Sequence, residues 1–225
     1  MKKTTVKIAL DGPSGSGKST MAKLLAKDMG FVYIDTGALY RTIGLYCAKK
    51  GVAADDLNGI IALLPEINIK MQLIDGGGVV YLNGRKIGDE IRTPEITKYA
   101  SDVSKIPEVR SFLLELQRMI ADENNTIMDG RDIGTVILPD AQVKIFMYAD
   151  DKTRARRRYN ELIAKGYDVK YEDVLSDMMK RDKNDRERQI APAIPADDAI
   201  IHDNSGMSIE ENFEALKKII NEKLI

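Results

Sequence analysis

Residues 11–20 read DGPSGSGKST, a stretch that contains the phosphate-loop template of a glycine, any four residues, then Gly, Lys and Ser or Thr. The template positions are filled by Gly12, Gly17, Lys18 and Ser19. The stretch follows an apolar run at residues 5–10 and precedes a helical pattern of apolar residues. A strand, a glycine-rich turn and a helix in this order predict a binding site for a nucleotide polyphosphate.

The residue types of this loop suit a polyphosphate. Glycines at 12, 15 and 17 allow positive φ angles, so that backbone N–H groups turn inward toward an anion, and the following helix adds the positive end of its dipole. Lys18 can reach the β- and γ-phosphates, and the Ser19 hydroxyl can complete a Mg²⁺ shell made mostly of water and phosphate. We expect nucleotide contacts along the loop, at Gly12, Pro13, Ser14, Gly15, Ser16, Gly17, Lys18, Ser19 and Thr20.

Length and charge limit the class of protein. The chain has 225 residues, of which 44% are hydrophobic, enough for one domain with an insertion or for two small domains. Lys and Arg number 34 against 35 Asp and Glu, a net charge of −1, so no overall positive field favours nucleic acid as a partner. No apolar run has the length of a membrane span or of a signal-peptide core, so we expect a cytoplasmic protein that does not bind membranes.

The chain has one cysteine and one histidine. Cys47 cannot form a disulfide within the chain, and we expect it to be a buried apolar residue. His202 follows an apolar stretch and is expected at the end of a strand rather than in catalysis. The site must therefore work without an imidazole base.

Apolar strand-like runs alternate with helical patterns along the chain. This alternation predicts an α/β fold in which a five-stranded parallel sheet carries helices on both faces. The expected strands are residues 5–10, 31–34, 126–128, 143–148 and 199–202. After the helix that follows the phosphate loop, the expected helices are residues 37–49, 55–64, 94–105, 108–122, 151–164, 171–188 and 208–223.

Residues 66–92 break this alternation. Short runs of alternating apolar and polar residues are separated by the turn sequences DGGG at 75–78 and NG at 83–84, which are typical of β-hairpins. We expect a small three-stranded antiparallel insertion at 66–92, within a core domain formed by residues 1–65 and 93–225.

Polar residues follow two of the expected strands. Asp35 and Thr36 come directly after the strand at 31–34, and the helix that follows presents Arg41 in its first turns. Ligands of open α/β sheets collect at the carboxyl ends of strands, which favours a second substrate here. The alternative for Asp35 and Thr36 is a plain helix N-cap.

The strand at 126–128 runs into the sequence DGRDIG at 129–134. Charged residues and glycines at a strand terminus indicate a substrate cleft rather than packing. Asp129 is placed to hold a magnesium-bound water, although a residue in this position can also simply cap the turn.

Two arginine clusters lie on expected helices. Arg154, Arg157 and Arg158 stand at i, i+3 and i+4, so they share a helix face and repel one another unless carboxylates or a polyphosphate offset them. The second cluster consists of two arginines and a carboxylate that share a helix face. Arg181, Asp185 and Arg188 stand at i, i+4 and i+7. The alternatives are a solvated basic face for the first cluster and a solvated salt-bridge network for the second.

Many arginines and no catalytic histidine favour one kind of chemistry. A phosphate acceptor has a second pKa of about 6, is largely ionised at neutral pH and needs no strong base. The obstacle to its reaction with a nucleoside triphosphate is repulsion between anions, which Lys, Arg and Mg²⁺ overcome by neutralisation and alignment.

Taken together, these segments resemble the bacterial cytidylate (CMP) kinases nearly end to end. The segments are DGPSGSGKST at 11–20, IDTGALYR at 34–41, IRT at 91–93, DGRDIGT at 129–135, PDAQVKIFMYA at 139–149, RDKNDRER at 181–188 and APAIPADDAIIHD at 191–203. The resemblance implies a P-loop nucleoside monophosphate kinase fold, with 66–92 in an enlarged monophosphate-binding domain and 150–165 as a short lid. It also implies a monomer that uses ATP and Mg²⁺ to phosphorylate CMP and dCMP to CDP and dCDP in pyrimidine nucleotide metabolism.

The resemblance also implies residue roles. Lys18 and Ser19 serve ATP and Mg²⁺, while Arg41 and Arg131 approach the acceptor phosphate. The lid arginines that reach the transferring phosphoryl group are Arg154, Arg157 and Arg158. The contacts to cytosine and phosphate are Thr36, Arg110, Asp132 and Arg188. The contacts on the ribose side are Ser101, Arg181 and Asp185. Where family members carry Ser, Thr36 keeps the hydroxyl and adds a methyl group that narrows the pocket.

Cytosine complements the expected base pocket. Its N4 amino group is a donor that Asp132 can accept, whereas O4 of uracil would face the carboxylate at a cost of about 1 to 3 kcal/mol.

Three other classes share the phosphate loop. A GTP-binding switch would need Asn-Lys-X-Asp after a strand, a sequence that this chain lacks. A nucleic-acid-dependent ATPase is supported only by the local arginine clusters. A kinase with a hydroxyl acceptor, such as shikimate, would need a general base, for which the candidates are Asp35 and Asp132.

Overall fold

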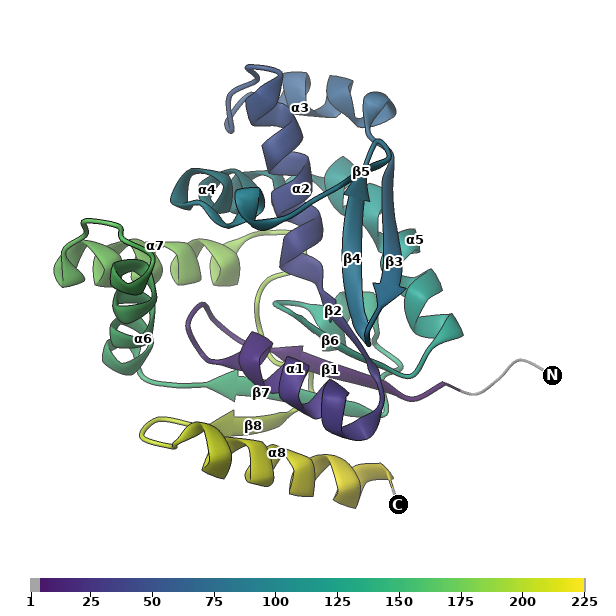
Figure 1. The fold of residues 1–225 in the computed structure, drawn as a ribbon, viewed down its shortest axis with the longest axis vertical. Coiled ribbons are helices and arrows are strands. Elements are labelled where there is room, and N and C mark those ends of the chain that lie inside the picture. Colours follow the sequence, from purple (N-terminus) through teal and green to yellow (C-terminus); the bar gives the residue numbers. More distant parts are fainter. Residues whose placement is uncertain (1–4, 225) are drawn as a thin grey trace.

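Five parallel strands form the centre of the structure, a computed structural model that describes residues 5–224 (Figure 1). In spatial order they are β2 (Val32–Asp35), β6 (Thr126–Gly130), β1 (Lys7–Asp11), β7 (Val143–Tyr148) and β8 (Ile200–Asp203). The five-stranded parallel sheet predicted from the sequence is confirmed. Because all five strands run the same way, their carboxyl ends lie along one edge of the sheet, where open α/β folds bind ligands.

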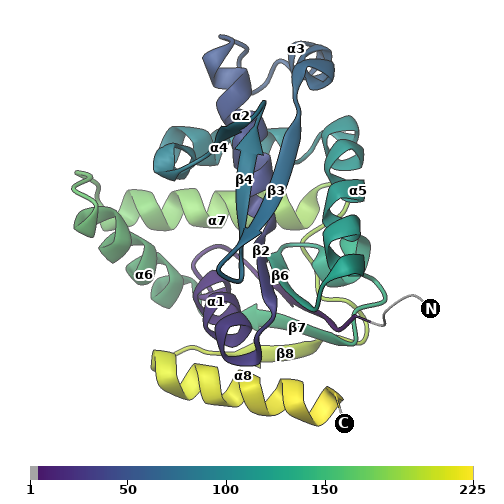
Figure 2. The same ribbon diagram turned by 45° about the vertical axis from the view of Figure 1, so that its right-hand side comes forward.

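Side chains alternate between the two faces of these strands. Ile8 and Leu10 of β1 pack with α1 (Lys18–Met29) and α8 (Ile209–Leu224), whereas Ala9 packs with α5 (Pro107–Glu123). Figure 2 shows α1 and α8 on one side of the strands and α5 on the other. Burial on both faces explains why the strands read as nearly continuous apolar runs.

The insertion after α3 forms the expected antiparallel strands. These are β3 (Ile69–Ile74), β4 (Gly77–Leu82) and β5 (Arg85–Lys86). Asp75-Gly76 and Asn83-Gly84 have positive φ at both positions, the property that suits the two-residue hairpin turns between these strands. β4 also pairs with β2, at Tyr33 and Gly77, so the insertion extends the parallel sheet at its edge.

A second apolar cluster lies beyond the carboxyl edge of the sheet. It joins the first turns of α5 to α2 (Thr36–Lys49), α3 (Leu57–Leu63), α4 (Pro94–Val103) and the inner face of β4. Two 3₁₀ turns, Leu64–Glu66 and Asp89–Arg92, connect these elements. In Figure 1, α2 rises from the end of β2 and carries this cluster away from α1 and α8.

The last two elements before β8 form a third unit. The helices α6 (Asp151–Ala164) and α7 (Tyr171–Glu187) pack against each other through a small apolar cluster of their own. Its buried members are Ala155, Leu162, Val174 and Met178. In Figure 1 the pair projects beside the phosphate loop, and α7 runs toward α4.

The predicted helices are confirmed, with ends that differ by three residues or fewer. The sequence did not indicate the π-helical turn at Ile133–Ile137, which follows β6.

Cys47 is fully buried in the α2 cluster, as expected. His202 lies in β8 and is bonded to Asn212 of α8, away from the strand-edge residues described below. Within residues 5–224, no helix is both long enough and apolar enough to cross a bilayer.

Candidate active site

A cleft of about 390 Å³ opens at the carboxyl edge of the parallel strands. Its lining comes from the phosphate loop, the ends of β2 and β6, and helices α2, α4, α5, α6 and α7. The cationic side chains in the lining are Lys18, Lys23, Arg41, Arg92, Arg110, Arg131, Arg158, Lys165, Arg181 and Arg188. The carboxylates are Asp35, Asp129, Asp132, Glu161 and Asp185. Because the whole chain carries a net charge of −1, this excess of cations makes the cleft a site for anions.

The phosphate loop has a backbone shape that requires glycine. Gly12 has a φ of +149°, and a Cβ there would lie 2.2 Å from the carbonyl oxygen of Met147. Gly15 has a φ of +73°, and a Cβ there would lie 2.9 Å from the carbonyl oxygen of Arg154. Helix α1 begins after Gly17 without a side-chain cap, so its first N–H groups are available to an anion.

Lys18 is buried at the start of α1, and its ammonium group donates to the carbonyl of Pro13 at 3.0 Å. Burial lowers the pKa of Lys18, and the neighbouring Arg131 lowers it further, while Asp129 opposes the shift. The negative charge of a polyphosphate favours the protonated form of the lysine. Phosphate binding and the positive charge of Lys18 therefore support each other.

Ser19 and Asp129 meet although they lie 110 residues apart in the chain. The Ser19 hydroxyl donates to one carboxylate oxygen of Asp129, and Tyr33 donates to the other at 3.1 Å. Burial raises the pKa of Asp129, and the charge of Asp35 adds to the shift, while Lys18 opposes it. Because Asp129 is buried near a second carboxylate, Asp35, added positive charge favours the ionised form of Asp129.

Oxygen donors of this kind are what Mg²⁺ prefers. Among residues 5–224, no group of three His, Cys, Asp or Glu side chains forms a metal cage. A hydroxyl and one carboxylate instead suit a cation that keeps most of its shell as water and substrate phosphate. Ser19 and Asp129 thus fit the magnesium site predicted from the sequence.

The end of β2 fixes Thr36 and Arg41. Asp35 caps α2 by accepting from the N–H of Ala38, and it also accepts from Arg41 Nη2 at 2.8 Å. The Thr36 hydroxyl donates to the carbonyl of Asp129 at 2.8 Å, which ties β2 to β6. Asp35 is therefore an N-cap, as in the plainer reading of the sequence, and in addition it directs Arg41 into the cleft.

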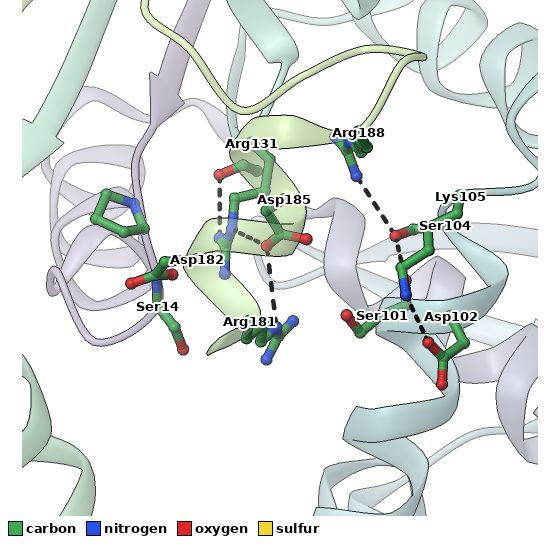
Figure 3. A network of polar contacts seen from close by, with 12 residues as sticks. Ser14, Ser101, Asp102, Ser104, Lys105, Arg131, Arg181, Asp182, Asp185 and Arg188 are labelled. Atoms are coloured by element: carbon green, nitrogen blue, oxygen red, sulfur yellow. Dashed lines mark hydrogen bonds and ion pairs between the residues drawn. The ribbon is translucent and has the colours of Figure 1, made fainter. Parts of the chain in front are cut away.

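Asp132 lies between two arginines at the far end of the cleft. Arg110 of α5 donates to one carboxylate oxygen, and Arg188 donates to the other at 3.2 Å. Figure 3 shows Arg188 reaching also toward Ser104, whose hydroxyl lies 3.4 Å from its Nη1. Burial raises the pKa of Asp132, whereas Arg110 and Arg188 act to lower it. The three side chains form a buried recognition group with a carboxylate at its centre.

Arg131, after β6, forms a neighbouring network with Asp185 and Arg181 of α7 (Figure 3). Arg131 Nε donates to Asp185 at 3.2 Å, and Arg181 Nε lies 4.0 Å from the same oxygen. Burial and the charge of Arg131 lower the pKa of Arg181 to about 10. One carboxylate therefore faces two guanidinium groups, which leaves positive charge for a ligand.

The loop that carries Arg131 and Asp132 is held by Asp11, which the sequence analysis did not single out. The two carboxylate oxygens of Asp11 accept the backbone N–H groups of Ile133 and Gly134, each at 2.8 Å. Burial is the largest cause that raises the pKa of Asp11 to about 7, against the lowering effect of these two hydrogen bonds. Asp11 thus fixes the start of the π-helical turn at Ile133–Ile137 and the direction of the two residues before it.

The three arginines expected to share a face of α6, Arg154, Arg157 and Arg158, do not point to one place. Arg154 is buried and donates to the carbonyl of Ser14 at 2.8 Å, to the carbonyl of Ala149, and to Asp151 and Asp182. Arg157 donates to Asn204. Among these three, Arg158 lines the cleft, where it pairs with Glu161 at 2.8 Å.

Most other expected site residues line the cleft. They are Ser14, Gly15, Lys18, Ser19, Thr20, Thr36, Arg41, Arg110, Asp129, Arg131, Asp132, Arg181, Asp185 and Arg188. Outside the lining are Gly12, Pro13, Ser16, Gly17, Ser101, Arg154 and Arg157. Ser104, directly after α4, lines the cleft whereas Ser101 does not, and the Ser104 hydroxyl donates to the carbonyl of Ser101 at 2.9 Å.

Several polar residues of the site carried no local signal. Asp182 accepts the N–H of Ser14 at 3.3 Å and pairs with Arg154, but in the sequence it is one acid among many on a charged helix. Asn204 is a lone amide after β8. Arg92 lies in the IRT segment and reaches Asp35 at 3.5 Å, and only its place in that segment could have marked it.

Known proteins are similar to this chain in sequence and in fold. A family model described as cytidylate kinase matches residues 8–222. A curated cytidylate kinase of Thermosipho melanesiensis is 50% identical over 217 residues, which cover 96% of this chain and 97% of the relative. Another, from Caldicellulosiruptor bescii, is 47% identical over 220 residues, which cover 98% and 95%.

Solved structures show the fold alone, because their sequences are distant. A shikimate kinase from Bacteroides thetaiotaomicron has a TM-score of 0.50 at 11% identity and covers 99% of this chain, with 100% of its own chain matched. An uncharacterized protein from Eubacterium ventriosum has a TM-score of 0.54 at 16% identity, with coverage of 97% and 99%. With a family match over nearly its whole length and close relatives that share it, this chain belongs to the cytidylate kinase family.

Proposed function

We propose that this chain transfers the γ-phosphoryl group of ATP to CMP and dCMP, which gives ADP and CDP or dCDP, as a step of pyrimidine nucleotide metabolism. The observation that carries the proposal is one cleft with a phosphate loop at one end and Asp132, between two arginines, at the other. Such a cleft has the features needed to hold two nucleotides with their phosphates facing each other.

The donor end consists of the phosphate loop and the N-terminus of α1. Backbone N–H groups of the loop and Lys18 bind the β- and γ-phosphates of ATP. The Ser19 hydroxyl and the Asp129 carboxylate would hold Mg²⁺. The bound ion supplies neutralisation of charge on the β- and γ-phosphate oxygens.

The acceptor phosphate lies between the donor end and Asp132. Arg41 and Arg131 bind it, and both are held by carboxylates, Asp35 and Asp185, that fix the direction of their guanidinium groups. An oxygen of the acceptor phosphate attacks the γ-phosphorus, and ADP leaves. A phosphate oxygen is already ionised at neutral pH, so none of these residues has to remove a proton.

Cytosine is recognised by Asp132 with Arg110, Arg188 and Thr36. A carboxylate accepts from the N4 amino group of cytosine, and the two guanidinium groups supply donors for N3 and O2. Uracil presents O4 in place of the amino group and leaves the carboxylate without a donor. Ser101, Arg181 and Asp185 serve the ribose side, where the Ser101 contact requires movement of α4 toward the ligand.

We further propose that residues 66–92 belong to the monophosphate-binding domain and 150–165 to a lid. The separate apolar clusters of the α2 region and of the α6–α7 pair support this division, because each holds its unit together independently of the other. We also propose that the protein is a monomer and acts on free nucleotides in the cytoplasm. Light scattering on the purified protein tests the monomer.

An acceptor panel tests the function. ATP-dependent release of ADP is measured with CMP, dCMP, UMP, AMP, GMP and shikimate, each at several concentrations. We expect the highest kcat/KM for the two cytidine nucleotides. Faster turnover of another acceptor would contradict the cytosine assignment, and turnover of shikimate alone would indicate a kinase that acts on a hydroxyl.

A further inference from the structure

Asn204 is a fully buried amide at the carboxyl end of β8. It follows the last residue of the edge strand, and its backbone N–H donates to the carbonyl of Tyr148 at 2.9 Å. It does not line the cleft, and no motif in the sequence marks it. Its side chain nevertheless makes two hydrogen bonds to residues on either side of the donor site.

The first bond fixes the phosphate loop. Asn204 Nδ2 donates to the carbonyl oxygen of Ser16 at 2.8 Å, across 188 positions of sequence. Ser16 is fully buried and lies directly before Gly17, the residue that precedes α1. The bond therefore fixes the peptide that aims the last loop N–H groups toward a phosphate.

The second bond fixes an arginine of α6. Arg157 Nη1 donates to Asn204 Oδ1 at 2.9 Å, and Arg157 Nη2 donates to the carbonyl of Asn204 at 3.2 Å. A guanidinium group that donates two hydrogen bonds to one residue has a fixed plane. A Cβ built on Gly17 would lie 3.8 Å from Arg157 Nη1, so the guanidinium lies beside the N-terminus of α1.

We propose that Asn204 is a positioning residue for the donor nucleotide. Its amide sets the distance between the phosphate loop and the Arg157 guanidinium, so that both face the ATP phosphates in the arrangement that binds them. The proposal rests on the proposed function for the identity of the donor. It assigns Arg157 to donor binding through Asn204 and gives the segment after β8 a part in the site.

The chemistry of the amide explains the residue type. Asn offers one donor group and one acceptor at the same side-chain length, so it can serve Ser16 and Arg157 together. In Asn204→Asp the acceptor for Arg157 remains, but a carboxylate oxygen faces the Ser16 carbonyl. In Asn204→Ala both bonds are lost. The two variants separate the part played by the loop from that played by the arginine.

The test measures donor binding directly. Calorimetric Kd values for a non-hydrolysable ATP analogue with Mg²⁺ are compared in the wild type and in Asn204→Ala, Asn204→Asp, Arg157→Ala and the double variant Asn204→Ala/Arg157→Ala. We expect the Kd to rise about 10-fold or more in Asn204→Ala, and the KM for CMP to change less than about 3-fold. The effects of the two substitutions should be less than additive in the double variant, because part of the effect of Asn204 on the donor is exerted through Arg157. Asn204→Asp should fall between Asn204→Ala and the wild type.

A control variant removes another buried amide side chain, one that hydrogen-bonds to β8 away from the cleft. Asn212 of α8 bonds to His202 of β8 at 2.8 Å, so Asn212→Ala should lower thermal stability and leave the donor Kd unchanged. An unchanged donor Kd in Asn204→Ala, or additive effects in the double variant, would overturn the proposal. If Asn204→Ala does not fold, the same comparison is made with Asn204→Asp and Asn204→Ser. Because the Kd is read without an acceptor, failure of the CMP assignment would appear only in the acceptor panel.

Discussion

Arg188 donates to Asp132 at 3.2 Å across 56 positions of sequence, and the two side chains are buried together in the lining of the cleft. Arg110 holds the other oxygen of the same carboxylate. The two guanidinium groups orient this carboxylate and favour its ionised form against the effect of burial, and the ionised form can accept a hydrogen bond from an amino group of a base.

Asp132→Ala should reduce the preference for CMP over UMP by roughly 5- to 100-fold, because the variant removes the acceptor for the cytosine amino group. The KM for ATP should change little, since Asp132 is bonded to Arg110 and Arg188 and makes no hydrogen bond to the phosphate loop. Steady-state kinetics with both acceptors measure the ratio. Asp132→Asn keeps the shape and tests whether the loss follows the charge, and an unchanged preference ratio in both variants would reject this base contact.

Arg154 and Arg158 should behave differently although both lie on α6. Arg154→Ala removes a buried guanidinium group and leaves the partly buried carboxylate of Asp182 without its ion-pair partner, so it should lower the free energy of unfolding by about 3 to 5 kcal/mol. Arg158→Ala removes an exposed pair with Glu161, so we expect a stability change of at most about 1 kcal/mol. If Arg158 reaches the transferring group, its loss lowers kcat by about 10³-fold or more. Denaturant unfolding and kcat on the same preparations separate the two roles, and unchanged kcat in Arg158→Ala would remove that residue from the catalytic step.

Gly12→Ala should distort the phosphate loop by a steric clash, in addition to the backbone strain that the positive φ angle of Gly12 would cause in alanine. A Cβ at Gly12 would lie 2.2 Å from a backbone oxygen, and backbone cannot move aside as a side chain can. Gly30→Ala is the matched control, because Gly30 has a φ of +67° and open space around it. We expect Gly30→Ala to cost about 1 to 2 kcal/mol of stability and to leave ATP binding intact, whereas Gly12→Ala should abolish binding. Similar effects of the two variants on ATP affinity would contradict the steric argument.

Asp11 should make stability depend on pH. Its pKa is raised to about 7 in the folded protein, from 3.8 in the unfolded chain. Between these values the folded state holds the proton and the unfolded state does not, so the contribution of Asp11 to stability is complete below about pH 4 and is lost as the pH rises through 7. The difference in unfolding free energy between the wild type and Asp11→Asn should therefore shrink from pH 5 to pH 7.5. A difference that stays constant over this range would show that Asp11 is ionised throughout.

The sequence by itself determined the elements and the phosphate loop. Strand and helix patterns are local, since side chains repeat every two or about 3.6 residues, and the loop template needs only neighbouring residues to express its chemistry. The hairpin turns at Asp75-Gly76 and Asn83-Gly84 are local for the same reason. This is why the five parallel strands, the helices and the antiparallel insertion could be predicted.

The tertiary structure alone decided what each charged side chain faces. Helical spacing put Arg154, Arg157 and Arg158 on related positions of α6, and it also explains the pair of Arg158 with Glu161 on the same helix. Arg154 and Arg157 find partners in the phosphate loop, α7 and the segment after β8, which periodicity does not place. Asp11 and Asn204 act on residues more than 100 positions away. A hydrogen bond depends on the distance between two groups in space, and between distant segments that distance exists only after the sheet has formed and the helices have packed on it.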